Sequence, residues 1–593
     1  MPTQSSARNL PSRLLVGGFK IGLAILLVFS LPGLYSCTYT PSLVPSKNIT
    51  ADLVLRNGDI YTVDAVRSWA DAVAIKGEHI VYVGHDSGAQ AFIDADTKVV
   101  DLNGKMILPG FQDVHIHPPW AGIKHQGCDL TDYYTLEETL AAIQKCVEGS
   151  PDKPFIRGDG WYVPLFPDGI PHKKILDEFD STRPLYFLSA DGHSLWVNSK
   201  ALETMGVTKE TPDPHGGRIE RDSATNEPIG VFQEDAAINM AWRHAPYTDE
   251  EIESGLRFAT HYLNSLGITS IQDAIVKLDS NDPYGSLEAY RKLNESGELT
   301  LRSVLALLWD VSQGPEQIQK FVEARRKYSG GNVKASSIKF WLDGIMEVKT
   351  AALLEPYLDG TNVSPYITQP DLDTYVAKLD KLGFQVHIHA IGDATVRSSL
   401  DAFAHTRRAN GIRDSRHHIC HLELINPTDI PRFKNLDVIA NFQPLWAIMD
   451  DYITERTIPI LGPERSRWLY PIGSVVKTGA VIAFGSDWYV STADPLPQIE
   501  TAVTREDAFD RFPGTFIPEE RISLHDAIAA FTINAAYVNF QENTTGSIEV
   551  GKIADMVALD TNLFDIDPKK ISDAKVLLTL FGGKAVYGSL DAF

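Results

Sequence analysis

The chain has 593 residues, of which 44% are hydrophobic and 22% charged, and its formal net charge is −23. This composition excludes an intrinsically disordered chain, and the length allows a large core with additional modules. The negative charge argues against nucleic acid as a partner, because no basic surface would face the phosphate backbone.

The N-terminal segment predicts an export signal. Basic residues precede an apolar run over residues 21–31, which is followed by Leu34-Tyr35-Ser36-Cys37. A charged start, a short apolar stretch and a small residue before the cut are typical of a secretory signal peptide. We expect a signal peptide over residues 1–36 and a polar tether over residues 37–50. The alternative is an uncleaved membrane anchor, for which the run is short.

The residues before the expected cut resemble a bacterial lipobox, which makes Cys37 the candidate lipidated residue of an exported, membrane-anchored lipoprotein. Thr38 behind it favours the outer membrane, on the periplasmic side. Three cysteines then remain, Cys128, Cys146 and Cys420, so at least one is a free thiol or forms an intermolecular bond. Cys128 could pair with Cys146, which the sequence does not decide.

Both ends of the body carry short strand-like runs. Turn signals such as Asn57-Gly58 separate the N-terminal runs, and the C-terminal end has the same pattern of short strand-like runs and turns. We expect one β-sandwich built from both termini, over residues 51–106 and 540–593.

The middle of the chain, residues 107–539, alternates strand-like and helical stretches. This pattern is typical of βα units, and eight strands are the number that closes an α/β barrel of the (β/α)8 TIM type. The interval over residues 119–246 is too long for one crossover helix and predicts an inserted subdomain. The eight expected strand cores are residues 107–117, 268–273, 302–308, 337–343, 384–389, 417–421, 438–443 and 481–487.

Two histidines, His115 and His117, end the first barrel strand. Their i, i+2 spacing puts both imidazoles on one strand face, where neutral rings can share a divalent cation. Catalytic side chains of such barrels come from the C-terminal strand ends. The other strand ends supply Lys339, His389, His421 and Asp487.

The histidine assignments have alternatives on the same strands. His387 shares a strand face with His389 and could be the ligand instead. Alternation also puts His417 on the face of His421, which lies nearer the strand end.

Lys339 and Asp487 also have structural alternatives. Lys339 could pair with Asp343, and Asp487 could cap the following helix. A lysine ammonium has no lone pair for a metal, so Lys339 becomes a ligand only as a carbamate formed with carbon dioxide.

Several motifs together resemble one family, the amidohydrolase superfamily in its YtcJ-like branch (amidohydrolase family 3). The motifs are Leu108-Pro109-Gly110-Phe111 with Asp113, His115 and His117, Asp191-Gly192-His193-Ser194, Ile338-Lys339-Phe340 with Asp343-Gly344, His389-Ala390-Ile391-Gly392-Asp393, Gly485-Ser486-Asp487-Trp488, and Thr532-Ile533-Asn534-Ala535-Ala536. The sequence departs from the family pattern over residues 345–350, where a bulkier, charged loop replaces the small residues that the family often has. The substrate preference of the family therefore need not apply to this chain.

The resemblance implies a binuclear centre with two divalent metal ions, for which zinc is the first expectation from the ligand types. Lys339 would be the carboxylated bridge, and Asp487 would also be the catalytic acid/base. The implied metal ligands are His115, His117, Lys339, His389, His421 and Asp487. Candidate substrate contacts are His193, whose motif matches, and Trp161.

The expected reaction is hydrolysis of a non-peptide, amide-type carbon–nitrogen bond in a small molecule. A hydroxide bridging the metals would attack the carbonyl, and Asp487 would move the proton to the leaving nitrogen. The alternatives are a deaminase, against which Lys339 argues, a lactone or ester hydrolase on the same barrel, and a non-catalytic exported metal-dependent binding lipoprotein.

Overall fold

The computed structural model describes residues 49–593 except residues 132, 215–216, 235–237, 239, 241–242 and 279–283. The expected signal peptide, Cys37 and nearly all of the expected tether lie outside the described residues. Within the described part of the chain, no helix combines the length and the apolarity that crossing a membrane requires.

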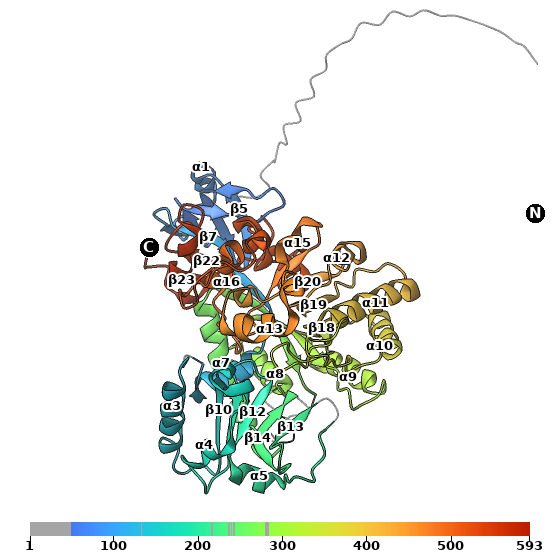
Figure 1. Cartoon of the computed structure of the whole chain (residues 1–593). Helices are drawn as coiled ribbons and strands as arrows, with labels where there is room; N and C mark the ends of the chain where they lie inside the picture. Colours follow the sequence, from blue (N-terminus) through green and yellow to red (C-terminus); the bar gives the residue numbers. More distant parts are fainter. Residues whose placement is uncertain are drawn as a thin grey trace, which may run out of the picture. The chain divides into compact units, whose positions relative to one another are not determined.

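Eight parallel strands form the barrel at the centre of the structure (Figure 1), and each corresponds to one expected strand core. The predicted α/β barrel is therefore confirmed. In sheet order the strands are β8 (Phe111–Ile116), β15 (Ile268–Val276), β16 (Arg302–Leu308), β17 (Val333–Trp341), β18 (Gln385–Ala390), β19 (His418–His421), β20 (Ile439–Phe442) and β21 (Ile482–Phe484).

The seam between β8 and β21 is joined by individual hydrogen bonds. The backbone N–H of Asp487 donates to His115 O at 2.8 Å, and that of Ser486 donates to Asp113 Oδ2 at 3.0 Å. One β20 side chain also crosses the seam, since Asn441 Nδ2 donates to Val114 O at 3.0 Å. The first and last barrel strands are thereby held together next to His115.

Amphipathic helices cover the outside of the barrel. In α7 (Asp249–Ser265) the Thr248 and Glu251 pair forms a capping box, and Leu256 and Leu263 are buried against the strands. The other helices that follow barrel strands are α2 (Pro118–His125), α8 (Leu287–Ser296), α9 (Gln317–Tyr328), α10 (Gln369–Lys381), α11 (Asp393–Asn410), α12 (Ile430–Leu436), α13 (Ile458–Leu461), α14 (Pro463–Ser466), α15 (Ile472–Lys477), α16 (Pro495–Thr504), α17 (Leu524–Ala530) and α18 (Ile533–Val538).

The N- and C-terminal parts of the described chain form two sheets around one apolar core, which includes Leu55, Ile107 and Leu580. Strands from both parts meet in one of these sheets. One sheet contains β1 (Leu53–Arg56), β4 (Ala72–Lys76), β5 (His79–Gly84) and β6 (Lys98–Asp101). The other contains β2 (Asp59–Tyr61), β3 (Trp69–Ala70), β7 (Met106–Pro109), β22 (Met556–Leu559), β23 (Val576–Phe581) and β24 (Lys584–Gly588).

β7 is the direct link between these sheets and the barrel. It pairs with β22 from the other end of the chain, and only Gly110 separates it from β8. The N–H of Gly110 donates to Asp555 O at 2.9 Å, which fixes this junction.

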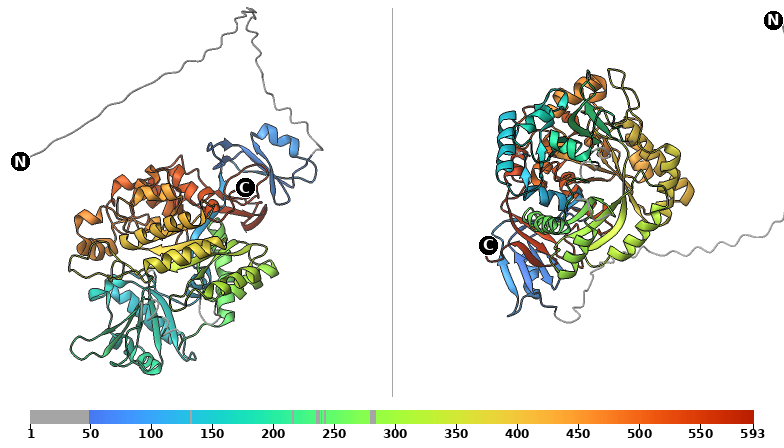
Figure 2. Two further views of the ribbon diagram at one scale, coloured as in Figure 1. Left: turned by 90° about the vertical axis from the view of Figure 1, so that its right-hand side faces the viewer. Right: turned by 90° about the horizontal axis from the view of Figure 1, so that it is seen from below.

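An additional sheet and its helices lie between β8 and α7 in the sequence. Figure 2 shows it at the end of the barrel opposite the terminal sheets. Cys128 and Cys146 form a disulfide here, which ties β9 to α3, and Cys420 is free. Its elements are β9 (Cys128–Asp129), α3 (Leu136–Glu148), β10 (Ile156–Trp161), α4 (Lys173–Asp177), β11 (Leu185–Ser189), β12 (Ser194–Val197), α5 (Ser199–Met205), β13 (Arg218–Arg221) and β14 (Pro228–Gln233).

Candidate active site

A cavity of about 600 Å³ lies at the C-terminal ends of the barrel strands. Its wall contains every residue that the sequence proposes as a metal ligand, together with His193 from the inserted sheet. The proposed ligands in the wall are His115, His117, Lys339, His389, His421 and Asp487.

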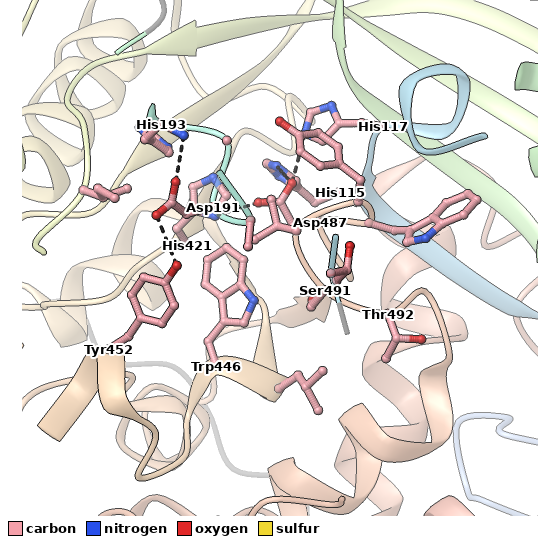
Figure 3. Close-up of a pocket in the computed structure, with 18 of the residues that line it drawn as sticks. His115, His117, Asp191, His193, His421, Trp446, Tyr452, Asp487, Ser491 and Thr492 are labelled. Atoms are coloured by element: carbon pink, nitrogen blue, oxygen red, sulfur yellow. Dashed lines mark hydrogen bonds and ion pairs between the residues drawn. The ribbon is translucent and has the colours of Figure 1, made fainter. Parts of the chain in front are cut away.

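Asp487 lies among three imidazoles (Figure 3). Its Oδ1 is 2.9 Å from Nε2 of His117 and 3.5 Å from Nε2 of His115, and its Oδ2 is 3.9 Å from Nδ1 of His421. Among the described residues Asp487 Oδ1 has no hydrogen-bond partner of acceptable geometry, and neither has Nδ1 of His117. One donor atom from each of His115, His117 and Asp487 lies within 4.8 Å of the others, so the group could hold a metal ion.

The electrostatics of this cluster suit cation binding. Burial, reinforced by neighbouring positive charge, lowers the pKa values of His115, His389 and His421 well below their usual value. These rings are therefore neutral at pH 7 and keep a lone pair. Burial opposes ionisation of Asp487, but its contacts with His115 and His117 outweigh it and hold its pKa well below the usual range.

Lys339 points into the barrel from β17 and is only 1% exposed. Its Nζ donates to the Sγ of Cys420 at 3.3 Å. Asp343, the alternative partner, instead accepts hydrogen bonds from Ile391 N at 3.1 Å and Gly392 N at 2.9 Å, and so organises the loop after β18. Lys339 is thus held at the cavity floor by a weak acceptor.

On β18, the structure separates the roles of the two histidines. His389 lines the cavity, with its ring centroid 4.5 Å from that of His421. His387 lies deeper, and its Nε2 is 2.9 Å from Nδ1 of His115. His387 therefore supports His115 from below, and Nε2 of His115 is the ring nitrogen near Asp487.

On β19, His421 and His417 do not share a face, which differs from the expectation. His417 stacks on Phe403 outside the barrel at 4.9 Å, whereas His418 lies inside, 4.0 Å from His387. Strict alternation would then turn His421 outward. The backbone of His421 instead has φ 74°, and this left-handed conformation re-aims its ring into the cavity.

His193, from the inserted sheet, lines the cavity and carries a positive charge. Its Nδ1 is 2.8 Å from Oε2 of Glu234. Burial alone would lower the pKa of His193, but the charge and hydrogen bond of Glu234 outweigh it and raise the pKa to about 9. The ring is thus protonated at pH 7, with its centroid 6.0 Å from that of His389.

The structure contradicts the expectation that Trp161 is a second substrate contact. It is fully buried in the core of the inserted sheet, and its indole N–H donates to Phe187 O at 2.9 Å. Successive strand residues point to opposite faces, so the next residue, Tyr162, lines the cavity in its place.

Five carboxylates in the cavity wall are absent from the sequence-based set: Asp129, Asp191, Glu347, Glu423 and Asp450. Glu347 lies in the charged 345–350 loop. Because this loop departs from the family pattern, the sequence could have indicated that Glu347 is a residue of the site. Glu423 follows His421 by two residues, but nothing in the strand pattern marks it.

Comparisons with known proteins agree with this geometry. A model of the Amidohydrolase family matches residues 98–587. Protein LONG AFTER FAR-RED 3 of Arabidopsis thaliana is 32% identical over 92% of this chain and 93% of its own length. The N-substituted formamide deformylase of Arthrobacter pascens is 25% identical over 90% of this chain and 98% of its own length.

A solved structure also matches. The crystal structure of an uncharacterized metal-dependent hydrolase from Pyrococcus furiosus aligns with a TM-score of 0.66 at 25% identity. The alignment covers 87% of this chain and 100% of that one.

Proposed function

Because the chain belongs to the amidohydrolase family, in its YtcJ-like branch (family 3), we propose that it is a metal-dependent hydrolase of a small amide-type substrate. The bond cleaved is a carbon–nitrogen bond other than a peptide bond. The observation that carries the proposal is the convergence of four histidines, Lys339 and Asp487 on one cavity. The name of the Arthrobacter relative supports an N-substituted amide as the substrate class.

The donor set fits two divalent metal ions, for which zinc suits the imidazole and carboxylate ligands. His115, His117 and Asp487 would hold one ion, and His389 and His421 the other. The neutral imidazoles and the Oδ1 of Asp487, which makes no hydrogen bond within the described structure, support this fit. When bound, such ions supply Lewis-acid polarisation of the carbonyl and an acidified water.

Lys339 would complete the centre as a carbamate between the two ions. For this, its neutral amine forms an N–C bond to carbon dioxide and releases one proton. Nζ of Lys339 donates to the Cys420 thiol, which is a weak acceptor, and among the described residues it forms no ion pair with a carboxylate. This supports the role, because no carboxylate partner holds the ammonium.

The chain's own acid and base groups would move the protons. Asp487 is ionised and would accept a proton from the attacking water, then deliver it to the leaving nitrogen. The protonated His193 lines the same cavity and would donate a hydrogen bond to the oxygen on which negative charge develops.

Metal content is the first test. With bicarbonate present, we expect about two metal equivalents per chain in the wild type and a clear loss in Lys339→Ala, since the carbamate of Lys339 would be a ligand of both ions. Lys334→Ala, at an exposed position on the same strand, is the matched control. One equivalent unaffected by Lys339→Ala would favour a mononuclear deaminase, and metal-free protein would favour a binding protein.

Asp487→Asn tests the catalytic assignment. We expect this variant to retain metal by elemental analysis, because the amide oxygen can still act as a ligand, while turnover falls by about 10²–10⁴-fold with the loss of the general base. Asp510→Asn removes an exposed carboxylate and should leave turnover unchanged. Wild-type turnover in Asp487→Asn would contradict the proposed role.

We also propose that the protein is an exported lipoprotein anchored through Cys37, on the periplasmic side. The Cys128–Cys146 disulfide supports this, because structural disulfides persist mainly in oxidising compartments. Replacing Cys37 with Ser should move the protein from the membrane fraction to the soluble fraction. An unchanged distribution would reject the anchor.

A further inference from the structure

Four of the five additional carboxylates of the cavity wall lie outside the proposed metal centre and interact electrostatically with one another. They come from four separate loops: Asp191 from the β11–β12 turn, Glu347 from the loop after β17, Glu423 from the segment after β19, and Asp450 from the segment before the turn at Tyr452–Thr457. We infer that these residues, called here the acidic subsite, bind a substituted ammonium group on the substrate. This inference rests on the proposed function, because it names the substrate class of the same cavity.

Glu423 is the strongest evidence for a ligand here. Its side chain lines the cavity and is only 2% exposed, and its Oε1 has no hydrogen-bond partner among the described residues. A buried carboxylate oxygen without a donor is costly, by about 1–3 kcal/mol or more. A positively charged group of the substrate would remove that cost.

Two cationic side chains, His193 and Arg511, line the cavity together with the acidic subsite, and each forms an ion pair with a carboxylate outside the subsite. His193 is engaged by Glu234 at 2.8 Å. Arg511 contacts Asp507 at 3.1 Å and donates to the hydroxyl of Tyr134 at 2.6 Å. Both cations form ion pairs with carboxylates outside the subsite, and their charges also act on Asp191, Glu347 and Asp450 within it. The four carboxyl groups of the subsite thus outnumber the two cations, which they share with other carboxylates.

The carboxylates of the subsite are close enough to influence each other. Burial, together with the charges of Asp191 and Asp450, raises the pKa of Glu347 to about 7. The hydroxyl of Tyr452 donates to Oδ2 of Asp191 at 3.3 Å (Figure 3). A single bound cation could therefore relieve the repulsion among several of these groups.

Aromatic side chains surround the acidic subsite and favour an organic cation over a metal ion. Tyr162 and Tyr452 pack edge to face with centroids 5.2 Å apart, and Trp446 and Tyr470 line the same cavity. Aromatic faces attract substituted ammonium groups, whereas Mg²⁺ and Ca²⁺ take oxygen ligands and water. The subsite thus resembles the mixed acidic and aromatic surfaces that bind alkylammonium groups.

The subsite adjoins the reacting centre. Glu423 follows His421 by two residues, and Figure 3 shows Trp446 and Tyr452 on the His421 side of the cavity. A substrate with its ammonium end here would present its amide toward Asp487. The expected substrate class is an N-substituted amide with a positively charged end.

Binding of choline, used as a probe alone, tests the subsite without requiring turnover. Calorimetry on the metal-loaded protein should show choline binding at least about tenfold more tightly than neohexyl alcohol, its uncharged carbon isostere. Glu423→Gln and, independently, Glu347→Gln should abolish this preference. Glu455→Gln, which removes an exposed charge from the adjacent turn, should keep it.

Hydrolysis of a matched pair of formamides tests the substrate class. The trimethylammonioethyl formamide should exceed the uncharged neohexyl formamide by about tenfold in kcat/KM, and the ratio should fall toward one in Glu347→Gln. Equal hydrolysis of both amides without choline binding would overturn the subsite and leave the proposed function standing.

Two further outcomes separate the possible failures. Choline binding that depends on Glu423, with neither amide hydrolysed, would reject the proposed reaction and support the subsite. Displacement of choline by stoichiometric Ca²⁺ or Mg²⁺ in the wild type, lost in Glu423→Gln, would show a metal site and overturn the ammonium assignment.

Discussion

Asp273 lies buried in β15, where the hydroxyl of Tyr290 donates a hydrogen bond to its Oδ2 at 2.9 Å. Burial is the main reason that its pKa is raised to about 8, against hydrogen bonds that lower it. The carboxyl group is therefore protonated in the folded protein at neutral pH.

This buried acid predicts a pH-dependent stability. Between the unfolded pKa of about 4 and the folded pKa, the folded state binds more protons than the unfolded state, so its stability falls as the pH rises. Asp273→Asn lacks this titration. Relative to wild type, the unfolding midpoint of Asp273→Asn should therefore rise between about pH 5 and about pH 9. The same difference in midpoint at both pH values would contradict a raised pKa.

At the residue scale, the sequence predicts the site residues at the strand ends, His421 among them, but not the local backbone that turns His421 into the cavity. His115, His117 and His389 follow period two, so their location at the cavity could be predicted. His421 reaches the cavity through φ 74°, which no local pattern encodes. Trp161 has the residue type of a ligand contact, but its burial in the inserted sheet depends on packing between distant segments.

At the element scale, the seam between β8 and β21 positions the first pair of histidines. Gly485 packs against this seam, and a Cβ added there would lie 2.5 Å from both the Cβ and the backbone N of His115. Neither atom can move without shifting β8.

Gly485→Ala should therefore displace His115 and lower metal content and turnover together, by about tenfold or more, because small shifts of reacting groups are costly. Elemental analysis and kcat measurements would show this. Gly330→Ala adds a Cβ that meets no atom within 4 Å and is the control. Normal metal content in Gly485→Ala would show that the seam tolerates movement.

The elements themselves were largely predictable, because each barrel strand is a short apolar run bounded by turn residues. The pairings between strands were harder to predict from the sequence. The sequence suggests a sandwich from both termini, but it does not specify the parallel pairing of β2 with β7, and the antiparallel pairing of β7 with β22 depends on a contact between the two chain ends. The order of the inserted sheet likewise depends on long-range packing.

At the scale of the whole molecule, a largely buried ion pair joins the barrel to the terminal sheets. Arg302, at the start of β16, contacts Oδ2 of Asp555 through Nε at 2.7 Å, and Asp555 is 2% exposed at its side chain. Asp555 Oδ1 also accepts from Gly582 N at 2.7 Å. The pair thus links a barrel strand to the segments around β22 and β23.

Asp555→Ala should lower the free energy of unfolding by about 3 kcal/mol, because it leaves a largely buried arginine without its partner. Urea titration followed by circular dichroism would measure this. Glu464→Ala removes an exposed partner of Arg467 and should change stability by less than about 0.5 kcal/mol. Equal effects of the two substitutions would show that the Arg302–Asp555 ion pair contributes little to the free energy of unfolding.

The pairing of β7 with β22 has a consequence for the order of synthesis. Leu108 pairs with Val557, so about 450 residues must be translated before β7 acquires this neighbour. At about 5–20 residues per second, this takes roughly half a minute or more. His115 and His117 lie at the end of β8, which only Gly110 separates from β7, so the segment that carries both histidines gains its final neighbour only when the last strands exist. Unfinished or prematurely terminated chains should therefore be inactive, however much of the barrel they contain.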